Sequence, residues 1–208
     1  MVDLVSKENP WEKYYRSGNP DWKGSPFPFP GPVGDSKALD VGCGTGSTVL
    51  QALDMGYNVW GIDISGSAIE KCRARLELGG FYAHLVKCDF LEWKSDERFD
   101  TILLHHFLSS LKMDERGRAV EKAREFLDSG GIISFQDFSI DDFRYGKGKK
   151  LEENTFLKGN SLTCHFFSED EVRDLFDDME IMVLETRSWG MGPKGKRKLR
   201  SRIRALIR

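Results

Sequence analysis

Short apolar stretches alternate with amphipathic stretches through the middle of this 208-residue chain. The apolar stretches have the length of buried strands and occupy residues 38–41, 58–62, 83–87, 100–104 and 131–137. Helical spacing of apolar residues covers residues 47–55, 66–78 and 114–128. Strands that alternate with helices form a parallel sheet with right-handed crossovers. The pattern therefore predicts an α/β fold whose strands end at one shared edge, where such folds bind ligands.

The C-terminal part of the chain has a different order of elements. A helix over 168–178 precedes two strands, over 180–189 and 199–207, which a turn at 190–193 joins. In the last strand, apolar residues alternate with Arg200, Arg202 and Arg204, which predicts one apolar and one basic face. Arginines are not buried without partners. We therefore expect a thinly covered sheet face with an exposed row of arginines beside the binding edge.

A glycine-rich turn follows the first predicted strand, in the sequence Asp40-Val41-Gly42-Cys43-Gly44-Thr45-Gly46. Alternate glycines let a ligand approach the backbone closely. The helix behind them offers unpaired N–H groups and the positive end of its dipole. The dinucleotide pattern G-x-G-x-x-G is not met, because Gly46 comes one residue early. This spacing therefore disfavours a nicotinamide-dependent dehydrogenase, which ranks behind the functions considered below.

Two further strand ends carry carboxylates. Asp63 ends the second strand, where a carboxylate can accept both ribose hydroxyls of an adenosine. Asp89 and Phe90 follow the third strand and would suit the edge and face of an adenine. Together with the glycine-rich turn, they predict a nucleoside site.

Polar side chains also follow the next two strands. His105 and His106 come after the fourth strand, and Asp137 ends the fifth. A histidine and a carboxylate near an acceptor could orient it or remove its proton. Alternatively, one histidine packs in the core and the other caps the following turn. No histidine or cysteine spacing typical of a metal site occurs, so we expect none.

Residues 1–36 precede the predicted sheet. Trp11, Tyr14 and Arg16 lie on a short amphipathic segment, which could cap a bound cofactor or pack against the sheet. Residues 24–32 have proline at nearly every second position, which excludes helix and central strand. We expect an extended loop across the domain, over the mouth of the site, or a plain linker.

Composition and charge fit one globular domain over residues 1–208, with 39% apolar residues. The four cysteines form no CxxC pair, and no apolar run approaches membrane length, so we expect a soluble, cytoplasmic protein with reduced thiols that does not bind a membrane. The last fifteen residues carry eight positive charges and no acid. This asymmetry indicates a polyanionic partner, or simply a solvated edge.

Five segments in this order resemble the class I S-adenosylmethionine-dependent methyltransferases: 39–46, 61–65, 88–90, 99–104 and 126–131. The resemblance spans about half the chain. It implies a Rossmann-like, seven-stranded sheet of order 3-2-1-4-5-7-6 with antiparallel strand 7, helices on both faces, and S-adenosylmethionine as cofactor. The expected cofactor site comprises Trp11, Tyr14, Arg16, Asp40, Gly42, Cys43, Gly44, Gly46, Asp63, Ile64, Asp89, Phe90, Leu104 and His105.

A narrower resemblance begins at Gln136-Asp137-Phe138 and continues through Arg144-Tyr145-Gly146-Lys147-Gly148, 154–156 and 163–171. These segments are similar to the methyltransferases that make 3-methylcytidine in tRNA. The resemblance implies RNA as acceptor, bound by Trp22, Arg144, Phe156, His165, Arg200 and Arg202. Along the chain, we expect the single domain to comprise an N-terminal cap and loop (1–36), a cofactor-binding core (37–138), a substrate-side insertion (139–167) and a terminal helix and hairpin (168–208).

Two alternatives remain open at this stage. Methyltransferases of the thiopurine and tellurite types carry a similar aromatic-ended insertion and act on small acceptors. An intact glycine-rich turn also occurs in non-catalytic subunits that bind the cofactor and activate a protein partner. The sequence leaves the oligomeric state open.

Overall fold

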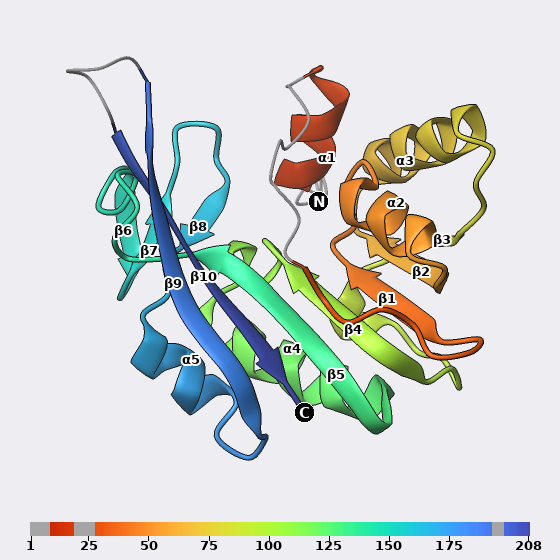
Figure 1. Ribbon diagram of the computed structural model, residues 1–208. Coiled ribbons are helices and arrows are strands. Elements are labelled where there is room, and N and C mark those ends of the chain that lie inside the picture. Colours follow the sequence, from red (N-terminus) through yellow and green to blue (C-terminus); the bar gives the residue numbers. More distant parts are fainter. Residues whose placement is uncertain (1–8, 19–27, 193–197) are drawn as a thin grey trace, which may run out of the picture.

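A seven-stranded sheet of order β3-β2-β1-β4-β5-β10-β9 forms the centre of the computed structural model, which describes residues 9–18, 28–192 and 198–208 (Figure 1). Its strands are β1 (Lys37–Val41), β2 (Asn58–Asp63), β3 (His84–Lys87), β4 (Phe99–His105), β5 (Leu127–Phe138), β9 (Ile181–Met191) and β10 (Lys198–Ile207). Strands β1 to β5 are parallel to one another, and β10 runs antiparallel to both β5 and β9. In sequence order of the sheet strands, this is the predicted 3-2-1-4-5-7-6 topology, and the prediction is confirmed.

Helices cover both faces of the sheet. Helices α2 (Ser47–Asp54) and α3 (Gly66–Leu78) pack their apolar residues on one face, in a cluster with Ala38, Val59 and Leu103. Helices α4 (Met113–Phe126) and α5 (Glu169–Leu175) pack on the other face, in a larger cluster that includes Leu104 and Phe135. Successive strand residues alternate between the two clusters, as the pleat requires.

The arginines of β10 are not the exposed row that the sequence predicts, and this prediction is wrong. The Arg202 residue is only 5% exposed, and its guanidinium lies 5.0 Å from the centre of the Trp189 ring. Arg204 pairs with Glu185 at 3.5 Å. Because β9 supplies an aromatic ring to Arg202 and a carboxylate to Arg204, these two arginines lie against the hairpin instead of forming an exposed row.

The segment between β5 and α5 forms a second, small sheet. Its antiparallel strands are β6 (Lys149–Glu152), β7 (Thr155–Leu157) and β8 (Thr163–His165), and their order is β6-β7-β8. Phe156 and Phe166 pack with Phe138 at the end of β5 in a cluster of their own. These aromatic contacts attach the small sheet to the end of the main one. Two short 3-10 helices, η1 (Phe90–Glu92) and η2 (Leu108–Ser110), follow β3 and β4.

Helix α1 (Pro10–Arg16) is held against the start of α3. The Glu12 carboxylate accepts hydrogen bonds from the Ser65 hydroxyl at 2.8 Å and from the Ser67 hydroxyl at 2.5 Å. The Lys71 ammonium donates to the backbone oxygen of Tyr15 at 2.6 Å. These contacts fix a seven-residue helix that would not be stable alone.

The described end of the proline-rich loop packs inward. Phe29 is 5% exposed, with its ring 6.1 Å from Tyr57 and 6.2 Å from His105. The Tyr57 hydroxyl donates to the backbone oxygen of Pro30 at 2.8 Å. Residues 28–30 therefore cover the sheet rather than form an open linker, while the rest of the predicted mouth-covering loop, 24–27, lies outside the described residues. No described helix combines the length and apolarity needed to cross a bilayer.

Candidate functional site

A cavity of about 630 Å³ opens at the carboxyl ends of β1, β2, β4 and β5. The glycine-rich turn and Asp63 line one end of it, and α1 lines the side above them through Trp11 and Tyr15. The small sheet and the loop before it line the other end, through Arg144 and Lys158. The cavity therefore joins the predicted nucleoside site to the segment that the sequence predicts as the substrate side.

The glycine-rich turn approaches α1 closely at Gly44. This residue has a φ of 53°, which favours glycine, and a Cβ placed on it would lie 2.7 Å from the Tyr15 hydroxyl oxygen. Gly42, with a φ of 71°, is crowded in the same way by the Phe107 ring. Any side chain at these positions would displace the walls of the cavity. The absence of side chains at Gly42 and Gly44 therefore lets the backbone of the turn form this wall of the cavity.

Asp63 is the group that fits a ribose. Its Oδ2 accepts a hydrogen bond from the Gly44 N–H at 2.9 Å, and its Oδ1 accepts from the Ser65 N–H at 2.8 Å. Burial raises the pKa of the carboxyl, and the two backbone N–H groups oppose this shift. A carboxylate can accept about four hydrogen bonds, so each oxygen keeps a lone pair for a ligand hydroxyl. The donor set thus fits an adenosine cofactor bound through its two ribose hydroxyls.

The next strand end lines the same part of the cavity. Asp89 is exposed, and its Oδ1 accepts from the Leu91 N–H at 2.9 Å, which begins η1. Phe90 is buried, with its ring 5.8 Å from that of Phe107. Ile64, next to Asp63 in the chain, also lines the cavity. A carboxylate beside apolar side chains suits the amino edge and the face of an adenine.

Some residues predicted for the cofactor do not reach the cavity. Among the described residues that line it, Trp11, Gly42, Cys43, Gly44, Asp63, Ile64, Asp89, Phe90 and His105 are present, and Tyr14, Arg16, Asp40, Gly46 and Leu104 are absent. Leu104 is a core residue under the sheet, and Gly46 is the N-cap of α2. In α1, the neighbouring Tyr15 takes the place expected for Tyr14, because it lies on the inward face of the helix.

Asp40 supports the glycine-rich turn from behind. It is 2% exposed, and the N–H of Val49 donates to its carboxyl group. Gly46 offers no side chain to cap α2, so Asp40 satisfies a free N–H of the first helical turn. Burial and the nearby Asp63 raise the pKa of Asp40 to about 8. Asp40 therefore supports the turn without lining the cavity itself.

His105 and His106 have different surroundings at the end of β4. The Nε2 of His105 lies 2.9 Å from the Ser134 hydroxyl, and burial lowers the pKa of this residue to about 3. Such an imidazole is neutral at pH 7 and a poor proton acceptor. His105 therefore lies in the cavity wall as a neutral imidazole that contacts the Ser134 hydroxyl.

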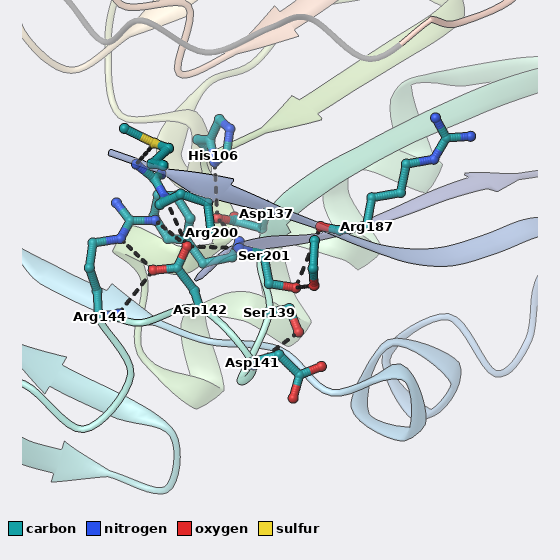
Figure 2. Close-up of polar contacts among 12 residues, drawn as sticks. His106, Asp137, Ser139, Asp141, Asp142, Arg144, Arg187, Arg200 and Ser201 are labelled. Carbon is teal, nitrogen blue, oxygen red and sulfur yellow. Dashed lines mark hydrogen bonds and ion pairs between the residues drawn. The ribbon is translucent and has the colours of Figure 1, made fainter. Parts of the chain in front are cut away.

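His106 adopts a left-handed backbone conformation, with a φ of 58°, which turns its side chain toward the cavity. Its Nδ1 lies 3.4 Å from Asp137 Oδ1, and its ring stacks on Phe138 at 4.8 Å (Figure 2). Burial lowers the pKa of His106, and the hydrogen bond to Asp137 only partly offsets this. The carboxylate favours the neutral tautomer with the proton on Nδ1, so Nε2 is left as an acceptor near the Gln136 amide nitrogen, 3.4 Å away.

Asp137 itself is fully buried behind His106. Its Oδ2 accepts a hydrogen bond from the Ser109 N–H at 2.9 Å, and its Oδ1 accepts one from the N–H of the next residue, Phe138, at 3.0 Å. It does not line the cavity. The three residues predicted as catalytic thus lie together, but only the two histidines face the acceptor space.

Positive charge gathers at the opposite end of the cavity. Arg144, Lys147 and Lys158 line it there. The Lys158 ammonium lies 4.7 Å from the centre of the Phe166 ring and donates to the backbone oxygen of Lys147 at 2.8 Å. Burial lowers the pKa of Lys158. This end suits an acceptor that carries negative charge or carbonyl oxygens.

Other residues predicted for the substrate lie elsewhere. Phe156 is buried beneath the small sheet, and His165 lies on the far side of it, with its ring nitrogens 2.8 Å from Thr155 Oγ1 and 2.8 Å from Glu171 Oε1. Arg200 and Arg202 lie on β10 and do not line the cavity. These four residues do not line the cavity, and Trp22 lies outside the described residues, so their contact with a substrate stays a prediction.

The sequence reasoning missed several residues that line the cavity, among them Tyr15, Phe138 and Lys147. Phe138 could have been found, because it follows Asp137 at the end of a strand that points at the site. The described residues include no group of three or more histidines, cysteines and acids placed to hold a metal ion.

Residues 38–131 match the family described as Methyltransferase domain. The tRNA N(3)-cytidine methyltransferase METTL2 of Danio rerio is 28% identical over 169 residues, which are 76% of this chain and 48% of that protein. The Mus musculus protein of the same name is 31% identical over 162 residues, which are 71% of this chain and 41% of that protein. The chain thus spans about half the length of these curated relatives.

Solved structures with this fold include an S-adenosylmethionine-dependent methyltransferase of Methanosarcina mazei. It matches with a TM-score of 0.65 and 24% identity, over 83% of this chain and 92% of that one. The 1,6-didemethyltoxoflavin-N1-methyltransferase of Burkholderia thailandensis, solved with S-adenosylhomocysteine, matches with a TM-score of 0.60 and 18% identity, over 84% and 71% of the two chains. At these identities, the likeness concerns the fold.

Proposed function

Since the chain carries a class I S-adenosylmethionine-dependent methyltransferase domain related to the tRNA N(3)-cytidine methyltransferases, we propose that it transfers a methyl group from S-adenosylmethionine to a base of tRNA. The observation that carries the proposal is the single cavity that joins Asp63 and the glycine-rich turn to Arg144 and Lys158. One end has the donors and acceptors of a nucleoside site, and the other has the positive charge that an RNA requires.

The residues of the first end would hold the cofactor. Asp63 would accept the two ribose hydroxyls, Asp89 would accept from the adenine amino group, and the backbone of Gly42 to Gly44 would lie along the methionine part. Trp11 and Tyr15 of α1 would exclude water from above. When bound, S-adenosylmethionine supplies an electrophilic methyl group on a positively charged sulfur.

The two histidines that line the cavity, His105 and His106, favour an acceptor atom that already has a free lone pair. His105 and His106 both have lowered pKa values, so neither is poised to take a proton at neutral pH. A ring nitrogen such as N3 of cytidine needs no deprotonation before attack. The residues of the chain then act by holding the base against the methyl group, and such positioning can supply roughly 7–11 kcal/mol.

The names of the relatives support tRNA cytidine as the specific acceptor. The basic end of the cavity supports the same choice, because a base must enter together with its phosphates. Arg144, Lys147 and Lys158 could neutralise these phosphates at the mouth. Binding of the acceptor should therefore weaken as salt concentration rises.

The test is transfer of labelled methyl from S-adenosylmethionine by the purified protein, with total tRNA in one reaction and a small-molecule extract in another. We expect label in tRNA, with a KM for tRNA that rises with salt. Label in the small-molecule fraction alone would contradict the RNA proposal. Label in neither fraction, with cofactor binding intact by calorimetry, would contradict both methylation of tRNA and methylation of a small molecule. It would indicate a cofactor-binding subunit that needs a partner.

A further inference from the structure

We propose that Asp142 is a positioning residue, which holds the guanidinium of Arg144 at the cavity wall so that it can donate to an oxygen of the acceptor. This inference rests on the proposed function, because it assigns Arg144 to the acceptor. Asp142 lies outside the cavity and would act only through Arg144.

Asp142 and Arg144, which are two residues apart, are joined by three hydrogen bonds. Asp142 Oδ1 accepts from the backbone N–H of Arg144 at 3.0 Å and from Arg144 Nε at 2.7 Å. Asp142 Oδ2 lies 3.2 Å from Arg144 Nη2 (Figure 2). A fork of two side-chain hydrogen bonds fixes the plane of a guanidinium as well as its position. The Asp142 side chain has no exposed surface, so water does not compete for these bonds.

The same carboxylate is anchored on β10. Its Oδ2 accepts from Arg200 Nε at 2.9 Å and from the Ser201 N–H at 3.0 Å. Although burial opposes ionisation, the hydrogen bonds from Arg144 and Ser201 lower the pKa of Asp142 below its usual value. Asp142 is therefore ionised at neutral pH and attaches the loop that carries Arg144 to the main sheet.

Arg144 is held at the part of the cavity wall that Phe138 and His106 also line, which is the part assigned to the acceptor. Its guanidinium carbon lies 4.1 Å from the centre of the Phe138 ring, and the His106 ring stacks on the same Phe138 at 4.8 Å. Asp142 uses Nε and Nη2, and among the described residues no hydrogen bond is made by Nη1. The donors of Nη1 can thus reach a carbonyl or phosphate oxygen of a bound nucleotide.

Asp141→Asn is a matched control for Asp142→Asn, because Asp141 is the adjacent aspartate and is exposed. For Asp142→Asn we expect kcat/KM for tRNA to fall at least tenfold, while the Kd for S-adenosylmethionine stays within twofold. Asp141→Asn should leave both unchanged. A purely structural role for Asp142 would instead weaken cofactor binding along with acceptor turnover.

A double-mutant cycle separates positioning from other effects. Arg144→Gln should lower kcat/KM for tRNA by a similar factor, and adding Asp142→Asn to it should cause no further loss. If the loss of kcat/KM in the double variant equals the product of the losses in the two single variants, the proposal is overturned. If Asp142→Asn fails to fold, Arg144→Lys decides the question, because it keeps the charge and leaves the Asp142 bonds to β10 in place. It should still lose turnover, since lysine cannot form the fork.

One readout does not depend on the acceptor. The Nε–H of Arg144, protected by its hydrogen bond, should give a slowly exchanging side-chain NMR signal that Arg144→Lys removes. The signal should persist in Asp141→Asn and vanish in Asp142→Asn. If wild type methylates no tRNA but shows this pattern, the proposed function fails while the positioning of Arg144 by Asp142 stands. A signal that persists in Asp142→Asn overturns the positioning role, whatever the enzyme methylates.

Discussion

The backbone N–H of Gly44 donates to the Asp63 carboxylate at 2.9 Å, which ties the glycine-rich turn after β1 to the end of β2. Asp63 therefore shapes the turn and also faces the cavity with its remaining lone pairs. One carboxylate sets the distance between the part of the site suited to ribose and the part suited to the methionine of the cofactor.

Replacing Asp63 should therefore weaken cofactor binding strongly. Hydrogen bonds to a charged group contribute about 1.5–3 kcal/mol each, so we expect Asp63→Ala to raise the Kd for S-adenosylmethionine by at least tenfold in calorimetry. Asp54→Ala, at the exposed end of α2, is the control and should bind normally. Unchanged affinity in Asp63→Ala would show that the nucleoside site is elsewhere.

Helix α1 should depend on the ionised form of Glu12. Hydrogen bonds from Ser67 and Ser65 lower the pKa of Glu12 to about 2. A lowered pKa in the docked state means that the contact is complete above pH 4.5 and is lost as the pH falls toward 2. We expect the protection factors of the amides in residues 11–16 to stay constant from pH 5 to 8, because Glu12 is ionised throughout this range, and to be lower in Glu12→Gln.

Because Trp11 and Tyr15 line the cavity, Glu12→Gln should also weaken cofactor binding by a few-fold, which about 0.5–1.5 kcal/mol per lost hydrogen bond allows. Glu77→Gln on the exposed side of α3 is the control. Equal exchange in Glu12→Gln and wild type would mean that the Ser65 and Ser67 contacts do not hold α1.

The buried Asp40 should make stability fall with rising pH. Its folded-state pKa of about 8 lies above the ordinary 3.8, so the folded chain keeps a proton that the unfolded chain releases in this range. The contribution is complete below pH 3.8 and is lost as the pH rises to about 8, at up to about 1.4 kcal/mol per pH unit. Asp40→Asn keeps the shape without the proton.

Urea unfolding at pH 5 and pH 8 measures this effect. Wild type should lose more free energy of unfolding between the two pH values than Asp40→Asn, and the exposed control Asp35→Asn should behave like wild type. The same pH dependence in wild type and Asp40→Asn would mean that Asp40 is ionised in the folded protein.

His106 should affect turnover moderately. Its lowered pKa keeps the imidazole neutral above pH 6.5, so kcat/KM for tRNA should be constant from pH 7 to 9 and should fall only on the acid side. We expect His106→Gln to lower kcat by less than about 100-fold, at the lower limit of the 10²–10⁴ that a general base contributes. A larger loss, together with a pH profile that follows one basic group near neutrality, would identify His106 as a base.

The cofactor end of the site could be predicted because it depends on position along the chain. Parallel strands bring their carboxyl ends together, so Asp63, Asp89 and the glycine-rich turn had to meet once the alternation of strands and helices was recognised. The small sheet of β6 to β8 was missed because strands of three or four residues carry no recognisable periodicity.

The acceptor end depends on contacts between distant segments, which the sequence does not display. Asp141 and Asp142 are identical neighbours, and only the packing of β10 makes one of them a buried partner of Arg200. The predicted arginine row was wrong for the same reason, because Glu185 and Trp189 lie opposite it on β9. Since β10 lies between β5 and β9, the basic C-terminal stretch is partly a structural strand.

The most direct test of methyl transfer to tRNA is nucleoside analysis by mass spectrometry. Undermodified tRNA would be incubated with the wild-type protein and S-adenosylmethionine carrying a deuterated methyl group, then digested to nucleosides. We expect the deuterated methyl on N3 of cytidine, with much less in reactions that contain Asp63→Ala at a cofactor concentration below the wild-type Kd. A wild-type protein that binds the cofactor but leaves every nucleoside unlabelled would contradict the account.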